Sequence, residues 1–364
     1  MGNILLDEPI KISGKKIKSI VNNPQKTAKA VNLIYVNDLQ PGISRKKKGD
    51  NFKYLLNNKE VDDDEELLRI KHLVIPPAWQ RVWICSLDNG HLQATGFDTM
   101  NRKQYRYHAL WNKFRNQTKF YKLSEFGEVL PTMRLRLEKD LSLPGLPLNK
   151  VLAAVISLME RTNIRVGNDF YEKLYGSFGL TTLKDRHVEF SPGAVKFTFI
   201  GKKGVPHDIK LKNRKLSNIV KQCRDIPGKE LFQYYDEAGK HHSIDSGKVN
   251  DYIKSISGRE FTAKDFRTWS GTTKAFLALK SLGCCETQVE TKRRITAALD
   301  IVSAHLGNTR TVCKKYYVHP VILSLYESRE LETYFKELDE MLIDYSKAGL
   351  TPEEKIVMKI LAKN

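Results

Sequence analysis

Hydrophobic residues recur at helical spacing through the last two thirds of the chain. One apolar stripe repeats at i, i+4, i+7 and i+11, and it consists of Ile295, Leu299, Val302 and Leu306. This spacing predicts a helix that ends at Gly307, because glycine commonly follows the last helical turn. Residues 262–265 resemble a capping box and begin a second predicted helix, which Gly283 ends. Further helices are predicted at 123–141, 148–161, 323–344 and from 351 to about 362.

Shorter apolar runs, bounded by turn residues, predict strands in the first third of the chain. These runs lie at 33–36, 82–85 and 91–95. Asn89-Gly90 supplies a hairpin turn between the last two. The basic run 45–48 is expected in a loop, and the acidic run 62–66 begins a short helix that ends by 75–77. The N-terminal part is therefore predicted to be a small, mainly β domain.

The strand period returns once inside the helical part, at 180–183, 187–190, 196–200 and 208–211. Gly201 to Gly204 would form a hairpin tip that carries Lys202 and Lys203, which suits contact with a groove or a solvated turn alike. We therefore predict an α+β fold. Residues 1–30 form an arm or extension, 31–112 a β-rich domain, and 113–364 a mainly helical domain with a small β-hairpin sheet, with a hinge near 111–121.

The charge of the chain indicates its partner. Among 364 residues, 61 Lys and Arg outnumber 42 Asp and Glu, which gives a formal net charge of +19. Such an excess favours a polyanion, nucleic acid before a membrane surface, although it also serves solubility. The five cysteines are odd in number and lack C-x-x-C spacing, so neither a disulfide framework nor a zinc site is predicted. The absence of a signal peptide or a long apolar run predicts an intracellular protein without a membrane anchor.

Three stretches carry candidate phosphate chemistry. After the helix that ends at Gly307, Lys314 and Lys315 lead into Tyr316 and Tyr317, where cations would stabilise a phenolate that attacks a phosphodiester. The alternative is that both tyrosines pack in the core. A cation at Arg267 opposes the helix dipole unless an anion binds there. Residues 102–108 interleave cations, an amide and aromatic rings, which suits either DNA contact or an exposed edge strand.

The chain lacks a P-loop, an H-E-x-x-H motif and a cluster of acidic metal ligands, so the chemistry would depend on cations and a tyrosine. In these respects it resembles the type IB DNA topoisomerases of the poxvirus-like bacterial kind, from about residue 31 to at least 320. The stretches that carry the resemblance are 73–79, 90–96, 103–108, 161–167, 199–202, 264–269 and 305–320.

The resemblance implies a set of site residues. The catalytic positions fall on Arg165, Lys202, Arg267, Asn308 and Tyr317. Tyr316 is the nearest rival nucleophile, and Asn308 stands where the poxvirus enzymes have histidine. Asparagine donates a hydrogen bond but does not exchange a proton near neutral pH. Nearby His305 is expected to be structural. The DNA-binding positions are Arg102, Lys103, Gln104, Tyr105, Tyr107 and Lys203.

The resemblance also implies a reaction. Tyr317 would form a 3′-phosphotyrosyl bond, the free strand would rotate, and religation would leave relaxed DNA without ATP, metal ion or cofactor. The protein would act as a monomer on double-stranded DNA in the bacterial cytoplasm, at the nucleoid, with its two domains forming a C-shaped clamp. A tyrosine recombinase and a non-catalytic architectural DNA-binding protein are the alternatives.

Overall fold

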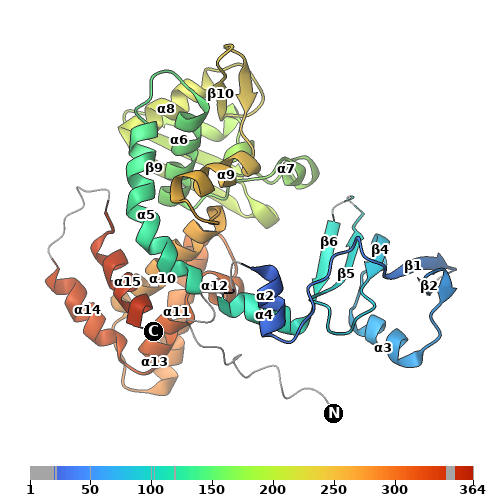
Figure 1. Ribbon diagram of the computed structural model, residues 1–364. Coiled ribbons are helices and arrows are strands. Elements are labelled where there is room, and N and C mark those ends of the chain that lie inside the picture. The colour runs from blue at the N-terminus through green and yellow to red at the C-terminus, as the bar shows by residue number, and fades with distance from the viewer. Residues whose placement is uncertain are drawn as a thin grey trace. The chain divides into compact units, whose positions relative to one another are not determined.

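The computed structural model describes residues 20, 23–49, 51–99, 101, 103–118, 120–341 and 349–363 (Figure 1). Contacts divide the chain into two compact units, Met1–Lys122 and Leu123–Asn364. A hinge was expected near 111–121. Most of that segment instead belongs to helix α4, Ala109–Thr118, whose buried face carries Trp111 and Phe114. Most of the predicted N-terminal arm lies outside the described residues. Its described part includes helix α2, Pro24–Ala30.

The first unit is built on an antiparallel sheet. Its described strands have the order β3-β2-β1-β4-β5-β6. Their bounds are Ile43–Lys48 (β1), Asn51–Leu56 (β2), Lys59–Glu60 (β3), Gln80–Ile84 (β4), Leu92–Phe97 (β5) and Lys103–Tyr107 (β6). Helix α3, Asp64–His72, begins where Asp63 accepts a hydrogen bond from the Glu65 N–H. The prediction of a small β-rich N-terminal domain is therefore confirmed.

Two local predictions in this unit are wrong. The basic run 45–48 is not a loop but most of strand β1, because it pairs along its length with β2. Residues 33–36 form no regular strand and contribute one isolated bridge, Ile34 to Gly90. The reason is that Leu33 and Val36 are buried while Ile34 and Tyr35 between them are exposed, so burial does not alternate as a strand requires. The predicted hairpin exists, although residues 85–91 form a wider connection than a two-residue turn.

The second unit is mainly helical. Its helices are α5 (Tyr121–Asp140), α6 (Leu148–Thr162), α7 (Asp169–Tyr175), α8 (Arg214–Arg224), α9 (Ser246–Ser257), α10 (Ala263–Leu282), α11 (Gln288–Leu306), α12 (Arg310–Tyr316), α13 (Pro320–Glu327), α14 (Leu331–Glu340) and α15 (Pro352–Lys363). Two small antiparallel sheets accompany them, one of β7 (Val188–Ser191), β8 (Ala194–Ile200) and β9 (Pro206–Lys212), the other of β10 (Gln233–Tyr235) and β11 (His241–Ser243). The α+β fold class is thus confirmed.

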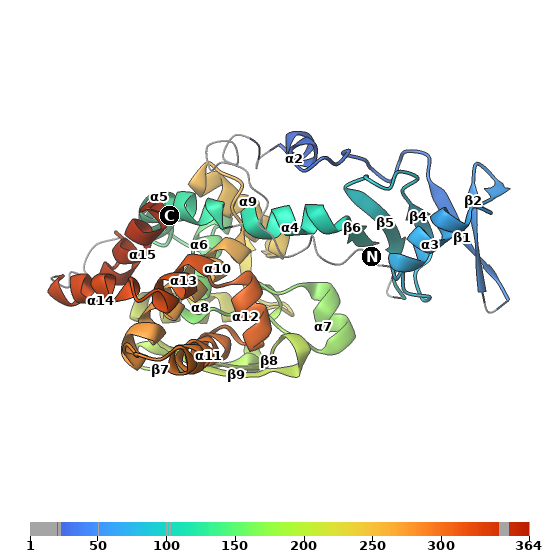
Figure 2. The same cartoon turned by 90° about the horizontal axis from the view of Figure 1, so that it is seen from below.

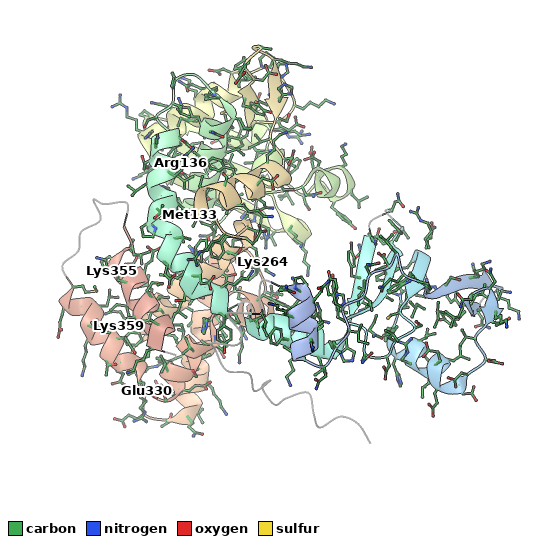
Figure 3. The ribbon with its side chains drawn as sticks, viewed as in Figure 1. Met133, Arg136, Lys264, Glu330, Lys355 and Lys359 are labelled. Atoms are coloured by element: carbon green, nitrogen blue, oxygen red, sulfur yellow. The ribbon has the colours of Figure 1, made fainter. Side chains whose placement is uncertain are left out.

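Helix α6 lies at the centre of this unit. Residues 151–159 are all buried, and the helix contacts α8, α9, α10, β9 and β10 (Figure 2). Helix α10 contacts α6, α11, α13 and α15. By contrast α5 is amphipathic, since Met133 is fully buried whereas Arg136 is half-exposed and forms an ion pair with Asp140 (Figure 3). The ends of α6, α10 and α11 are therefore fixed by packing on several sides.

Two predictions in the second unit also need correction. Residues 180–183 form a 3₁₀ turn, Leu180–Thr182, because they are buried and their backbone N–H groups bond to the segment after α6 instead of to a strand. The run 323–344 is not one helix. Most of its described residues lie in α13, which begins earlier at Pro320, and in α14, and the two helices are separated where Arg329 adopts a positive φ of 66°. Residues 342–344 lie outside the described residues. Neither correction changes the packing around the ends of α6, α10 and α11.

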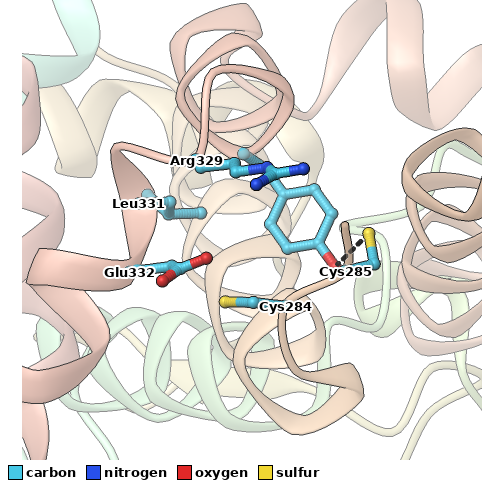
Figure 4. Close-up of a pocket in the computed structure, with 6 residues that line it drawn as sticks. Cys284, Cys285, Arg329, Leu331 and Glu332 are labelled. Atoms are coloured by element: carbon cyan, nitrogen blue, oxygen red, sulfur yellow. Dashed lines mark hydrogen bonds between the residues drawn. The ribbon is translucent and has the colours of Figure 1, made fainter. Parts of the chain in front are cut away.

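All five cysteines are free thiols. Cys284 and Cys285 follow α10 and line a small pocket with Arg329, Leu331 and Glu332 (Figure 4). Burial raises the pKa of Cys284 to about 11, and the nearby Glu332 adds to the effect, so its reactive thiolate is scarce at neutral pH. Among the described residues, no helix combines the length and the apolar character needed to cross a membrane.

Candidate active site

Arg165 is positioned by the end of α6. Asn163 ends that helix in the left-handed conformation, and the chain then turns into an extended segment. The backbone oxygen of Arg165 accepts a hydrogen bond from the Leu180 N–H at 2.9 Å. A Cβ atom at Gly179 would lie 2.6 Å from that same oxygen, so only glycine allows the two segments to approach this closely. The backbone of Arg165 is therefore fixed from both sides.

The Arg165 side chain reaches across to the end of α11. Its Nη2 donates to the Gly307 backbone oxygen at 2.7 Å and to Asn308 Oδ1 at 2.5 Å. Burial, together with the neighbouring charge of Arg267, lowers the pKa of Arg165 to about 10. The guanidinium nevertheless stays charged at neutral pH. Two predicted catalytic residues from distant parts of the sequence are thus in direct contact.

Arg267 is only 5% exposed, although it carries a charge in the second turn of α10. It donates to the backbone oxygens of Asn163 and Leu306, the second at 2.7 Å. These oxygens belong to the C-terminal ends of α6 and α11, where helix dipoles concentrate negative potential. The sequence predicted that this position is unfavourable unless an anion binds there. Two helix ends also stabilise the cation, and its Nε is left without an acceptor among the described residues.

The loop between α11 and α12 presents Asn308. Gly307 ends α11 with φ +59°, and the Asn308 N–H returns to the Ser303 oxygen at 3.0 Å. The side-chain oxygen of Asn308 faces Arg165, which leaves its Nδ2 amide group to donate elsewhere. Among the described residues this buried Nδ2 has no acceptor, and the same is true of Arg267 Nε. Leaving a buried donor unpaired costs about 1–3 kcal/mol, so both groups favour an anionic ligand.

Tyr317 follows the last turn of α12 and lies beside Arg267. The guanidinium carbon is 5.3 Å from the centre of the tyrosine ring. The backbone of Tyr317 packs directly on α10, because a Cβ atom at Gly271 would lie 2.6 Å from the Tyr317 oxygen. Thr272 donates to that oxygen at 3.3 Å. The ring of Tyr316 lies instead near Lys315, at 5.5 Å.

Lys202 and Lys203 lie at the tip of the β8–β9 hairpin. The Gly201 N–H donates to the Val205 oxygen at 2.7 Å, and Lys203 has a positive φ of 65°, which closes the turn. Both lysine residues are exposed. The predicted hairpin is confirmed, and it presents both ammonium groups on a tight turn.

His207 joins this hairpin to the rest of the site. Its ring stacks on Phe199, with the ring centres 4.8 Å apart. A Cβ atom at Gly201 would lie 2.6 Å from His207 Nε2, and one at Gly307 would lie 3.0 Å from its Cε1. The imidazole therefore fills the space between the base of the hairpin and the loop that carries Asn308. Burial, and then the charges of Arg165 and Arg267, lower the pKa of His207, so its ring stays neutral.

Sequence reasoning missed His207. A signal was present, because His207, Ile209 and Leu211 alternate along β9 and share its partly buried face. His305, which was expected to be structural, lies 3.0 Å from Asn163 Nδ2 and 3.3 Å from Ser270 Oγ through its Nε2. It thus ties the end of α6 to α10 and α11.

The predicted DNA-binding residues of the first unit lie on the edge strand β6. Lys103 forms an ion pair with Asp38 at 2.5 Å, and Gln104 donates to Asp98 at 2.9 Å. Tyr105 is 48% exposed and stacks on Tyr107, with ring centres 5.9 Å apart. Arg102 lies outside the described residues. The strand therefore presents the Tyr105 ring outward, whereas Tyr107 is partly buried and the polar side chains Lys103 and Gln104 already have partners.

Arg45, from the basic run in β1, has a structural role. It donates to the backbone oxygens of Ile75, Pro76, Pro77 and Trp79. Its guanidinium also stacks on Phe52 at 4.2 Å. The other residues of this run, Lys46, Lys47 and Lys48, are exposed.

Comparison with known proteins identifies the class of enzyme. Residues 108–342 match the family described as eukaryotic DNA topoisomerase I, catalytic core, and residues 51–98 match the family described as bacterial DNA topoisomerase IB, N-terminal domain. The chain therefore belongs to the type IB DNA topoisomerases, enzymes that bind DNA and relax it by cleavage and religation.

Two viral relatives extend this match over most of the chain. DNA topoisomerase 1B of Acanthamoeba polyphaga mimivirus is 33% identical over 320 residues, which cover 84% of this chain and 94% of the relative. DNA topoisomerase 1B of Vaccinia virus (strain Copenhagen) is 24% identical over 309 residues, which cover 80% of this chain and 93% of the relative. The resemblance to poxvirus-like type IB enzymes is thus confirmed.

Proposed function

We propose that this topoisomerase relaxes supercoiled DNA by a transient break in one strand, through a 3′-phosphotyrosyl bond to Tyr317, without ATP or a metal ion. One observation carries the proposal. The Tyr317 ring lies against Arg267, in a group of buried donors whose Asn308 Nδ2 and Arg267 Nε lack acceptors among the described residues. A phosphate at Tyr317 would supply those acceptors.

The cleavage step exchanges one phosphoester for another. Tyr317 Oη bonds to phosphorus and releases its proton to solvent, while the bond from phosphorus to the 5′ oxygen breaks. Lys202 donates a proton to the departing 5′ oxygen as general acid and is left as a neutral amine until religation. Arg165, Arg267 and Asn308 donate to the non-bridging oxygens, where transition-state charge develops. The new ester retains the energy of the broken one, so no ATP is needed.

The free 5′ end then rotates about the intact strand and releases supercoils. Its hydroxyl attacks the phosphotyrosyl bond, the proton returns to Lys202, and Tyr317 leaves as the strand closes. The substrate is double-stranded DNA, which a single copy of the chain would hold through Tyr105, Tyr107, Gln104 and Lys203. The exposed ring of Tyr105, which stacks on Tyr107, supports base or sugar contacts at this strand.

The decisive experiment is relaxation of a supercoiled plasmid in EDTA without ATP, together with recovery of a covalent protein–DNA adduct. Wild-type protein should relax the plasmid and should be recovered attached covalently to the 3′ end of the broken strand. Tyr317→Phe should lose both activities and keep DNA affinity, because only the phenol oxygen is removed. Tyr316→Phe, the matched control one residue away, should keep most of the activity.

Other outcomes separate the alternatives. If Tyr316→Phe is inactive and Tyr317→Phe is active, the nucleophile is Tyr316. A tyrosine recombinase would need two paired sites and would leave a plasmid without them supercoiled. An architectural DNA-binding protein would leave the linking number unchanged after deproteinisation.

A further inference from the structure

The first unit contains a cavity of about 380 Å³, and of the residues proposed to hold DNA only Tyr107 lines it. Tyr35, His91, Tyr107 and Trp111 line it, together with the cations Arg115 and Lys122. All six residues lie within the unit Met1–Lys122. Its volume falls in the range of about 300–1,000 Å³ that is typical of small-ligand sites.

The aromatic walls form a preorganised stack. The rings of Tyr35 and His91 are parallel to within 17°, with centres 4.3 Å apart. The Trp111 ring meets His91 edge-on at 4.5 Å, and Tyr107 lies 6.0 Å away. His91 is buried, whereas Tyr35 is 41% exposed. Tyr35 therefore offers exposed aromatic surface while its other face is held on His91.

The packing of α2 against α4 holds the chain that carries this aromatic stack. Trp111 and Phe114 of α4 form a small hydrophobic core with Ala28 of α2, Val31 and Leu33 (Figure 1). Tyr35 lies two residues after Leu33, which belongs to this buried core, so the backbone that carries the Tyr35 ring is held in place. A ligand that stacks on it would not have to order the site first, which lowers the entropic cost of binding.

Two walls of the cavity also carry ring N–H groups. Trp111 Nε1 is buried and has no acceptor in the part of the chain that the structure describes. His91 Nδ1 accepts the Val36 N–H at 3.1 Å, and burial lowers the pKa of His91, so the neutral ring carries its proton on Nε2. Nucleobases present carbonyl oxygens and ring nitrogens that accept such hydrogen bonds.

The cations give the cavity its charge preference. Among the described residues, neither Arg115 nor Lys122 forms an ion pair with a carboxylate. A ligand with a flat aromatic part and a phosphate would match both the rings and these charges. Tyr107 also belongs to β6, the strand proposed to contact DNA. This link favours a nucleotide within a DNA strand over a free mononucleotide.

We propose that this cavity binds a single unpaired nucleotide of the DNA, with its base stacked on Tyr35 and its phosphate near Arg115 and Lys122. A paired base cannot enter, because it is enclosed in the duplex stack. The site would therefore hold the protein preferentially at bulges and other extrahelical bases. The inference rests on the proposed DNA contact by β6, but not on the chemistry of Tyr317.

The test compares full-length protein on two duplexes that differ by one bulged 2-aminopurine. We expect wild-type protein to bind the bulged duplex more tightly by between about 5-fold and 150-fold, the effect of one base stacked on an aromatic ring. The fluorescence of the bulged 2-aminopurine should fall as this base stacks on Tyr35. Tyr35→Ala should abolish this preference and leave plasmid relaxation and affinity for the paired duplex unchanged, while Tyr35→Phe should restore the preference.

Tyr235→Ala is the matched control, since Tyr235 is also 41% exposed but lies in the second unit. It should keep the preference. Three results would overturn the inference: equal binding of the two duplexes by wild-type protein, equal effects of the two alanine variants, or equal preference for a bulge that lacks its base. Efficient competition by free dAMP would show that the ligand is a mononucleotide and would overturn the assignment to a DNA strand. Relaxation remains intact in all these cases if only this inference fails.

Discussion

Both arginines of the proposed active site are held by neutral oxygens. In the described part of the chain, Arg165 donates to a backbone oxygen and an amide oxygen, and Arg267 donates to two backbone oxygens. A carboxylate in either place would position the guanidinium equally well but would cancel its charge. Carbonyl dipoles fix the geometry and leave the full positive charge for a phosphate.

A methyl group at Gly271 tests how strictly Tyr317 is positioned. In Gly271→Ala the new Cβ would approach the Tyr317 backbone oxygen to 2.6 Å and the Leu306 side chain to 3.1 Å, so the tyrosine must move. We expect covalent adduct formation to slow by about 10²-fold, the effect of a displacement near 1 Å. Single-turnover cleavage measures it. Gly247→Ala is the control, because that Cβ would meet only the flexible Asp245 side chain; equal rates in the two variants would contradict this positioning.

Proton donation by Lys202 can be distinguished from the electrostatic effect of its positive charge. If Lys202 is the general acid, Lys202→Ala should slow cleavage by about 10² to 10⁴ fold. A substrate with sulfur at the 5′ bridging position should restore the rate, because a thiolate leaves without a proton. Arg267→Ala should remain slow on both substrates, since it loses charge stabilisation instead. If sulfur does not rescue Lys202→Ala, Lys203 and Arg165 are the next candidates for the acid.

At the scale of elements, the proposed active site is a meeting point of helix ends. The C-termini of α6 and α11 converge on Arg267, while α12 brings Tyr317 to the same place. The turn after α12 is held to α10 by Thr272, which donates to the Tyr317 oxygen and accepts the His319 N–H at 3.1 Å. Because these ends are joined to one another, a shift of one helix would displace several catalytic groups together.

His319 makes this junction sensitive to acid. Its Nδ1 accepts the Val321 N–H at 3.1 Å and caps α13, and burial lowers its pKa to about 4. The unfolded chain takes up a proton near pH 6.5, whereas the native ring does not. Stability is therefore complete above about pH 6.5 and is lost as the pH falls toward 4, by up to about 3 kcal/mol from this residue.

The variant His319→Asn should remove the part of this acid sensitivity that comes from His319. Asparagine can still cap α13, because it is a favoured N-cap residue and does not titrate. Urea unfolding at several pH values should give a smaller loss of stability between pH 6.5 and 4 for the variant than for wild type. Parallel curves for the two proteins would show that burial does not perturb His319.

For the whole molecule, charge governs DNA binding before chemistry begins. The chain has a net charge of +19, and Lys46, Lys47 and Lys48 are exposed on β1. We expect affinity for duplex DNA to fall steeply with salt, with a log–log slope of about 0.9 for each neutralised phosphate. Titrations between 50 and 200 mM salt, where six to ten contacts would cost about 10³ to 10⁵ in affinity, measure this slope. A slope near zero would exclude an electrostatic binding surface.

The sequence by itself determined most of the elements and the enzyme family. Helix stops at Gly283 and Gly307, the capping box at 262–265 and the hairpin around Lys202 depend on local backbone preferences, so a short window predicts them. The matches to the type IB family bear out the overall assignment. Local windows failed where burial was decided by distant partners, as at 33–36, 45–48 and 180–183.

Only the tertiary structure decided how the site residues are held. The carbonyl partners of Arg267 lie 104 and 39 residues away along the chain, so no local pattern predicts them. The same holds for Arg45, whose guanidinium binds backbone oxygens 30 to 34 residues further on. His207 was missed because its partners, Gly201 and Gly307, come together only when the hairpin packs beside the end of α11. Composition and spacing identify which groups can react, whereas long-range packing determines which of them keep a free charge or donor for the substrate.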